Sequence, residues 1–266
     1  MTDKTYQYTH PHPAVTTDIV IFTVQDDSLK LLLIQRGVEP FKGQWALPGG
    51  FINMDEDLDH AAARELEEET GVCDVYLEQF KTWGAPKRDP RERVITVAYF
   101  AIIPSDKITL AAGSDADNVQ WFDYQKLPAL AFDHADIVKQ AHETLVDKLK
   151  RTTVVIQFLP EEFTLTQLQR IHEIILNEDI DKRNFRKWVE SLDYIQATGK
   201  KETGSAHRPA MLYTATTPDN IQPAKWGKRE NKAVAKVDDE TRQVIHRQGY
   251  NEGLEAAMKQ LKGLRK

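Results

Sequence analysis

Residues 49–72, GGFINMDEDLDHAAARELEEETGV, decide how this chain folds and which chemistry it can perform. The stretch begins with two glycines and a short loop. Its later part predicts a helix that ends at Gly71, a residue suited to the position just past a helix C-terminus. Glu65, Glu68 and Glu69 recur at spacings of three and four residues, so a helix places their carboxylates on one face. The sequence therefore predicts a cluster of negative charge beside a tight glycine turn.

Two interpretations of these acids compete. An acidic helix is most often a solvated face, on which Arg64 and Glu68 could form a pair one turn apart. The glycine pair and the apolar Leu66 and Val72, which would anchor the helix in a core, favour a functional site instead. Glu56 in the preceding loop can reach the same side. Converging carboxylates are hard oxygen ligands, which suit Mg²⁺ or Mn²⁺ and the phosphates of a substrate.

The same residues resemble a known family pattern. Gly50, Glu56 and the run RELEEETGV at residues 64–72 are spaced as in a complete Nudix box, and WALPGG at residues 45–50 is similar to the family's approach to that box. The resemblance implies hydrolysis of a diphosphate with Mg²⁺ or Mn²⁺ as cofactor. It implies catalytic roles for Arg64, Glu65, Glu68 and Glu69, and metal ligation by Glu56, Glu65, Glu68, Glu69 and the Gly49 carbonyl.

Length and composition favour two domains in a reducing compartment. The chain has 266 residues and a single cysteine, Cys73, which excludes a disulfide framework within the chain and is expected to be a small buried apolar residue. No apolar run approaches the roughly 20 residues that cross a bilayer, and the first residues lack the apolar core of a signal peptide. The sequence therefore predicts a cytoplasmic protein without a membrane partner.

The apolar pattern of the first 150 residues predicts a mixed sheet between helices, an α/β/α sandwich. Strands are expected near residues 14–24, 31–34, 76–83, 94–103 and 119–122, and a closing helix over residues 132–150. Asp133 is expected to cap that helix, and His134 to pack or act as a hinge. Asp115 and Asp117 are candidates for an acid outside the box, although turn residues are the simpler interpretation.

The loop GAPKRDPRER at residues 84–93 concentrates arginines in an otherwise acidic half of the chain. A solvated turn is one interpretation, and phosphate or ribose recognition by guanidinium groups is the other. This loop and the strand after it are similar to those of ADP-ribose-binding Nudix proteins, and Phe51 or Trp83 could stack on an adenine. The candidate substrate-binding residues are Arg36, Phe51, Arg88, Arg91 and Arg93.

The second half of the chain predicts a winged helix-turn-helix. Amphipathic helices are expected over residues 163–176, capped by Thr164 or Thr166, and over residues 182–192, followed by strands at 194–198 and 211–216 around a basic loop. We divide the chain into residues 1–150, 151–216 and 217–266. The last segment is a linker and an amphipathic helix from Asp238 to Leu264.

This order of parts resembles the Nudix-related transcriptional regulators of NAD metabolism over residues 14–215. The resemblance implies a homodimer that senses ADP-ribose, binds double-stranded DNA and, with an intact box, can hydrolyse its own signal. It implies DNA contacts at Lys182, Arg183, Asn184, Arg186 and Lys187 and, in the wing, at Lys200, Lys201 and Arg208. The alternative is a dedicated hydrolase of ADP-ribose or a related nucleoside diphosphate sugar whose second domain serves only dimerisation.

Overall fold

The computed structural model describes residues 8–73, 75–104, 119–149, 152–192, 194–202 and 209–216. All of these residues lie in one compact unit, Met1–Gly227. No helix of the described residues is long and apolar enough to cross a membrane. Asp115, Asp117 and Arg208 and the predicted helix from Asp238 to Leu264 lie outside the described residues.

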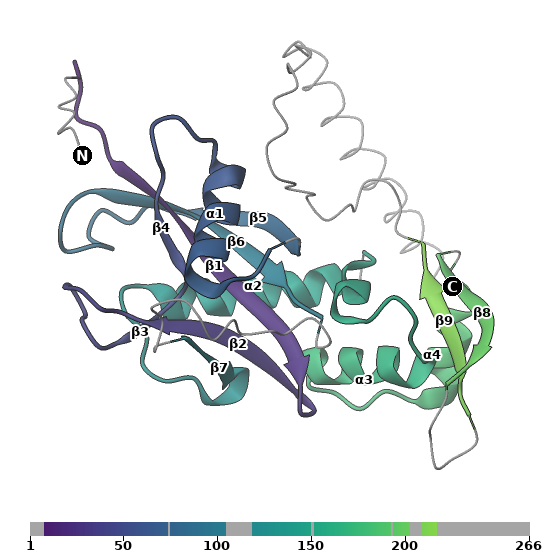
Figure 1. Cartoon of the computed structure of the whole chain (residues 1–266). Helices are drawn as coiled ribbons and strands as arrows, with labels where there is room; N and C mark the ends of the chain where they lie inside the picture. The colour runs from purple at the N-terminus through teal and green to yellow at the C-terminus, as the bar shows by residue number, and fades with distance from the viewer. Residues whose placement is uncertain are drawn as a thin grey trace, which may run out of the picture. The chain divides into compact units, whose positions relative to one another are not determined.

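The first part of the chain is built on a seven-stranded mixed sheet (Figure 1). Strands β1 (Ala14–Gln25) and β6 (Val94–Ile102) pair in parallel at its centre, and β2 (Ser28–Gln35), β5 (Tyr76–Trp83) and β7 (Val119–Asp123) add antiparallel pairs. Two short strands, β3 (Trp45–Ala46) and β4 (Gly49–Phe51), pair with β2 and β1. The sequence pattern missed β3 and β4 because neither carries enough residues to show an alternation.

Alternation along β1 and β6 divides the core into two layers. Ile19 and Ile21 face helix α1 (Leu58–Thr70), whose Ala62 and Leu66 pack against them. Val20 and Phe22 face the other way, towards helix α2 (His134–Leu149). The predicted α/β/α sandwich is therefore confirmed, with one helix on each face of the sheet.

The second part of the chain has the predicted order of helix, turn, helix and hairpin. After a short 3₁₀ segment, η3 (Val154–Phe158), come α3 (Leu165–Leu176), α4 (Lys182–Val189), β8 (Ile195–Lys201) and β9 (Met211–Ala215) (Figure 1). Thr164 and Gln167 form a reciprocal capping box at the start of α3, which confirms one of the two predicted caps. Its apolar side chains join the α2 layer in one continuous hydrophobic cluster.

Three local predictions need correction. Cys73 is exposed rather than buried, because it follows the end of α1. Helix α4 ends at Val189, three residues before the predicted end. Asp133 was predicted to cap α2, but its carboxylate accepts hydrogen bonds from the guanidinium of Arg88 in the loop at residues 84–93. The sequence around Asp133 does not reveal this contact.

Candidate functional site

The glycine turn and helix α1 bring the predicted box residues together. Asp57 caps the start of α1 by accepting from the His60 amide, and Gly71 ends the helix with a φ of 70°. At the other side, β4 pairs with β1 so that Gly49 lies opposite Asp18. The helix and the turn are therefore fixed to neighbouring parts of the sheet, which places the glutamates beside Gly49 and Gly50.

Arg64 organises the acids of the box. Its guanidinium makes a two-pronged ion pair with Glu56, with N–O distances of 2.7 and 3.0 Å. It also donates to Glu65 at 2.7 Å and to Glu68 at 3.0 Å. These bonds hold the pKa of Glu56 at about 2, chiefly through the hydrogen bond from Arg64. Arg64 thus holds three carboxylates close together, the role that the Nudix resemblance implies for it.

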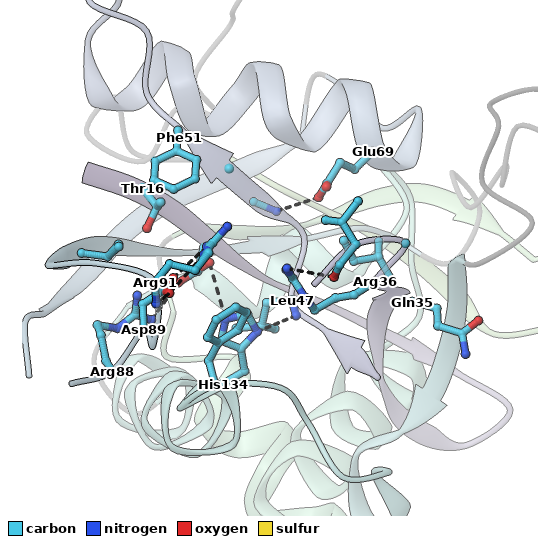
Figure 2. A pocket seen from close by; sticks show the side chains of 18 residues that line it. Thr16, Gln35, Arg36, Leu47, Phe51, Glu69, Arg88, Asp89, Arg91 and His134 are labelled. Atoms are coloured by element: carbon cyan, nitrogen blue, oxygen red, sulfur yellow. Dashed lines mark hydrogen bonds and ion pairs between the residues drawn. The ribbon is translucent and has the colours of Figure 1, made fainter. Parts of the chain in front are cut away.

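Glu69 reaches the turn directly. One of its oxygens accepts from the Gly49 amide at 2.6 Å, and Figure 2 shows its side chain pointing from the helix into the pocket. The pKa of Glu69 is raised to about 8, chiefly by burial and also by the nearby carboxylates of Glu65 and Asp18, against the lowering effect of the Gly49 hydrogen bond. Burial also raises the pKa of Glu65. Negative charge is therefore crowded into a partly dehydrated space.

This donor set fits a divalent cation of the hard class. Carboxylate oxygens are the preferred ligands of Mg²⁺ and Mn²⁺, and a cation would relieve the repulsion among Glu65, Glu69 and Asp18. Within the part of the chain that the structure describes, no three His, Cys, Asp or Glu side chains form a ready-made metal site. Arg64 occupies oxygens of Glu56, Glu65 and Glu68, so a cation at these residues competes with a guanidinium.

The turn requires glycine at position 49. The residue has a φ of 149°, and a Cβ there would lie 2.1 Å from the Thr17 carbonyl oxygen. Gly49→Ala is therefore expected to lower the free energy of unfolding by about 3 kcal/mol, from backbone strain and overlap with a fixed strand. Urea denaturation followed by circular dichroism measures this loss.

Gly84→Ala is the matched control, because a Cβ at Gly84 would meet its neighbours only at ordinary contact distances of 3.8 Å. Its effect is expected to stay within about 0.5 kcal/mol. Equal stabilities of the two variants would contradict the steric argument for the turn.

A pocket of about 310 Å³ opens next to the box. Figure 2 shows it between the helix that carries Glu69 and the start of α2, where His134 lies. Its lining includes the predicted ligand residues Arg36, Phe51, Arg88 and Arg91, and also Asp18, Asp89, Phe132 and His134. Of the predicted substrate-binding residues, Arg93 is absent from the lining, and its guanidinium donates to the carbonyls of Ala85 and Val94.

Two guanidinium groups and two aromatic rings shape the pocket. Arg36 lies over the Phe132 ring at 4.8 Å, and Arg91 lies over Phe51 at 5.4 Å. The pKa of Arg36 is lowered, first by burial and then by the positive charge of Arg91. The Asp89 carboxylate offsets part of this positive charge by pairing with Arg91 at 2.7 Å, so the pocket combines a charged element with apolar surfaces.

Arg88 is more deeply buried than Arg91, although Arg91 is also paired, with Asp89 at 2.7 Å. The side chain of Arg88 is only 4% exposed and pairs with Asp133 at 2.7 Å and with Asp18 at 3.2 Å. His134 lies in the same layer, where its Nδ1 accepts from the Leu47 amide at 2.9 Å and burial lowers its pKa. Although Arg88 lines the pocket, its donors join β1 to the start of α2, a structural role that loop composition alone does not predict.

The sequence analysis did not select Asp18 or Phe132. Asp18 stands in an apolar strand, where its burial opposite Gly49 depends on pairing with β4. Phe132 has a positive φ of 53°, and that backbone conformation turns the chain into the pocket wall. The short motif LAFDH at residues 130–134, which leads into the predicted helix 132–150, was the available signal for both Phe132 and His134.

A second candidate site lies on helix α4. Phe185 and Val189 are its buried residues, while its basic and amide side chains face solvent. None of the polar side chains that the sequence predicts to contact DNA on this helix makes an ion pair within the described ranges; they are Lys182, Arg183, Asn184, Arg186 and Lys187. Trp188 is 40% exposed and packs edge-on against His172.

The wing contributes two further candidates. Lys201 is exposed at the end of β8, and Lys200 pairs with Glu162 at 2.6 Å. That pair joins the wing to the segment just before α3. The described part of this domain thus offers a positively charged helix with free donors and a wing whose first lysine already has a partner.

Comparison with known proteins identifies both parts. Residues 12–141 match the Nudix domain model, and residues 155–215 match the NrtR DNA-binding winged helix domain. The sandwich and the box therefore define a Nudix protein that carries a winged helix.

The chain is 39% identical over 208 residues to the ADPR responsive transcriptional repressor NtrR of Acinetobacter baylyi, covering 77% of this chain and 82% of that protein. It is 40% identical to Shewanella oneidensis NrtR in a crystal structure with a 27mer DNA, covering 76% of this chain and 93% of that one with a TM-score of 0.67. The chain belongs to the NrtR family. Its Nudix part is also 41% identical over 128 residues to an ADP-ribose pyrophosphatase of Methanocaldococcus jannaschii, covering 48% of this chain and 72% of that enzyme.

Proposed function

We propose that this protein is a transcriptional regulator of NAD metabolism that binds DNA through α4 and the wing and binds ADP-ribose in the Nudix pocket. The observation that carries the DNA assignment is the exposed face of α4, with four basic side chains and no partners within the described residues. A helix that serves only dimerisation would instead present apolar side chains. The names of the relatives, one a repressor responsive to ADPR and one complexed with DNA, support the same assignment.

ADP-ribose fits the pocket by charge and shape. Arg36 and Arg91 supply positive charge for a diphosphate, and Phe51 and Phe132 supply apolar faces for a base or sugar. The neighbouring box would allow Mg²⁺- or Mn²⁺-dependent hydrolysis of ADP-ribose by water to AMP and ribose 5-phosphate. When bound, the metal would screen the charge of the diphosphate and activate water.

The chain's own residues would prepare that reaction. Glu68, Glu69, Glu65 and the Gly49 carbonyl would hold the metal, with Glu56 as an outer support. Arg64 would keep the carboxylates in place, as its bonds to Glu56, Glu65 and Glu68 allow. Arg36 and Arg91 would orient the diphosphate. We further propose the domain boundaries 1–150, 151–216 and 217–266, a cytoplasmic location and a homodimer that reads two DNA half-sites.

The hydrolase and regulator assignments are tested separately. AMP release from ADP-ribose by the full chain with Mg²⁺, and its absence in EDTA, would support the enzyme. Selection of duplexes from a random pool by the full chain would test the regulator, and ADP-ribose should release the selected duplex. Failure to enrich any duplex at low salt would refute DNA binding and favour the alternative, a dedicated hydrolase whose second domain only dimerises.

A single basic residue tests the role of α4. Arg183→Ala is expected to weaken binding of the selected duplex and to reduce the slope of log affinity against log salt by about one, because one phosphate contact disappears. Fluorescence anisotropy across a salt series measures both effects. Lys126→Ala, a change of a basic residue in the 3₁₀ segment η2 (Tyr124–Lys126), is the control and should leave the slope unchanged. An unchanged slope for Arg183→Ala would remove Arg183 from the contact surface.

A further inference from the structure

Helix α2 connects the nucleotide pocket with the DNA-binding domain through contacts at its start and in its middle. Its start belongs to the pocket, because Phe132 and His134 line the pocket and Arg88 holds Asp133. About two turns further along, His142 stacks on Tyr124, with ring centroids 4.4 Å apart. The His142 Nε2 donates to the Ile175 carbonyl of α3 at 3.2 Å.

The partner of His142 is a carbonyl that the helix itself leaves open. Ile175 lies in the last turn of α3, where the carbonyl groups accept no hydrogen bond from an amide of the same helix. His142 therefore fixes the C-terminal end of α3 to the Nudix domain. A second contact lies nearby, where Arg170 of α3 pairs with Asp27 of the β1–β2 turn at 2.8 Å. Because both members of that pair are largely exposed, we expect it to matter less than His142.

The end of α3 in turn sets the position of α4. The turn at residues 177–181 is bonded back to α3, since the Glu173 carboxylate accepts from the Ile180 amide and Gln169 donates to the Ile180 carbonyl. Asp181, the last residue of that turn, caps α4. A shift of α3 relative to the sheet therefore moves the basic face of α4 with it.

Binding of a nucleotide in the pocket could change the position of α2, and with it the contact between His142 and α3. Arg36 lies 4.8 Å from the centre of the Phe132 ring, which leaves no room for another ring between them. A nucleotide that stacks on that face of Phe132 must displace Arg36. Phe132 immediately precedes Asp133, whose carboxylate pairs with Arg88 and so holds the start of α2. A movement of Phe132 would therefore also move the start of the helix.

We propose that His142 is a positioning residue that couples the Nudix pocket to the DNA-binding helix, with the Arg170–Asp27 pair as a weaker second contact. This inference rests on the proposed function, since it assumes that ADP-ribose and DNA both bind. The coupling is the factor by which ADP-ribose weakens DNA binding. It must equal the factor by which DNA weakens ADP-ribose binding.

The experiment measures both factors for the full chain in EDTA, with ADP-ribose as the ligand and a duplex selected by the wild-type chain. His142→Phe keeps the ring but removes the N–H donor. It should leave the affinity for ADP-ribose alone within about twofold and reduce the coupling factor by roughly threefold or more. Arg170→Gln should reduce it less. His142→Gln, which retains a donor, should recover part of the coupling.

Lys148→Gln is the matched control. Lys148 also belongs to α2, but its ion pair at 2.8 Å is with Glu78 of β5 rather than with the winged helix. Its coupling factor should equal that of the wild-type chain. Thermal unfolding of each variant identifies any loss of fold, and the Gln rescue separates a lost donor from lost packing.

The outcomes are distinguishable. A wild-type chain that binds neither ADP-ribose nor any duplex overturns the proposed function. A wild-type chain that couples the two ligands, together with His142→Phe and Arg170→Gln variants that couple them equally well, overturns this inference alone. An equal loss of coupling in Lys148→Gln would also overturn it, because the effect would then belong to α2 in general.

Discussion

Glu69→Gln is expected to reduce Mg²⁺-dependent release of AMP from ADP-ribose by at least about 100-fold, a loss of roughly 3 kcal/mol of transition-state stabilisation. Glutamine is nearly the same size and keeps an oxygen that can accept from the Gly49 amide, so the turn should remain intact. It lacks the negative charge that would hold the metal beside the diphosphate. Affinity for ADP-ribose in EDTA should change only a few-fold, because Arg36 and Arg91 remain.

Glu67→Gln is the control for this change. Glu67 is an exposed residue of the same helix, and its side chain lies outside the pocket lining. Initial rates from chromatography of AMP, together with thermal unfolding of both variants, separate lost chemistry from lost structure. Equal rates for Glu67→Gln and Glu69→Gln would exclude Glu69 from the reaction.

Arg88→Met is expected to destabilise the Nudix part by about 3–5 kcal/mol, because it leaves the buried carboxylate of Asp18 and the partly buried carboxylate of Asp133 without their partner. The side chains of Asp18 and Asp133 are 10% and 19% exposed, so water cannot replace the guanidinium well. The same change removes the link between β1 and the start of α2. Urea denaturation should show the loss of stability, and calorimetric titration should show weaker binding of ADP-ribose.

Two further variants test whether unpaired charge causes the loss. Arg88→Met combined with Asp18→Asn and Asp133→Asn should recover part of the stability, because the buried charges disappear together with their partner. Arg93→Met removes a guanidinium that donates only to backbone carbonyls near the surface, and it should cost less than about 1 kcal/mol. If Arg88→Met were no more destabilising than Arg93→Met, the buried network would have no structural importance.

The box was predictable because its residues are close in sequence. Spacings of three and four residues place Glu65, Glu68 and Glu69 on one side of any helix, and Arg64 is near enough to bond two of them from the same helix. The residues of the pocket wall could not be predicted from local spacing in the same way. Phe132 and Asp18 are distant in sequence from the box, and only the pairing of β1 with β4 and the turn before α2 bring them to it.

The arginines of the loop at residues 84–93 show the same limit. Their composition indicated an anion-binding site, but it could not tell which guanidinium faces the pocket and which pairs inside the protein. Arg91 lies over Phe51 and pairs with Asp89, Arg88 is buried between Asp18 and Asp133, and Arg93 bonds the backbone. The prediction for Cys73 was wrong for a related reason, since a position just past a predicted helix end does not reveal whether the side chain packs against the core or faces solvent.

The sequence by itself determined the two domain types and the residues of the box, because helical and strand periods and local spacings are set by covalent geometry. Only the tertiary structure decided which charged groups are free and which are already paired. That depends on contacts between residues far apart in the chain, such as Arg88 with Asp133 and with Asp18. Burial makes such contacts strong, and burial is a property of the packed molecule rather than of any segment.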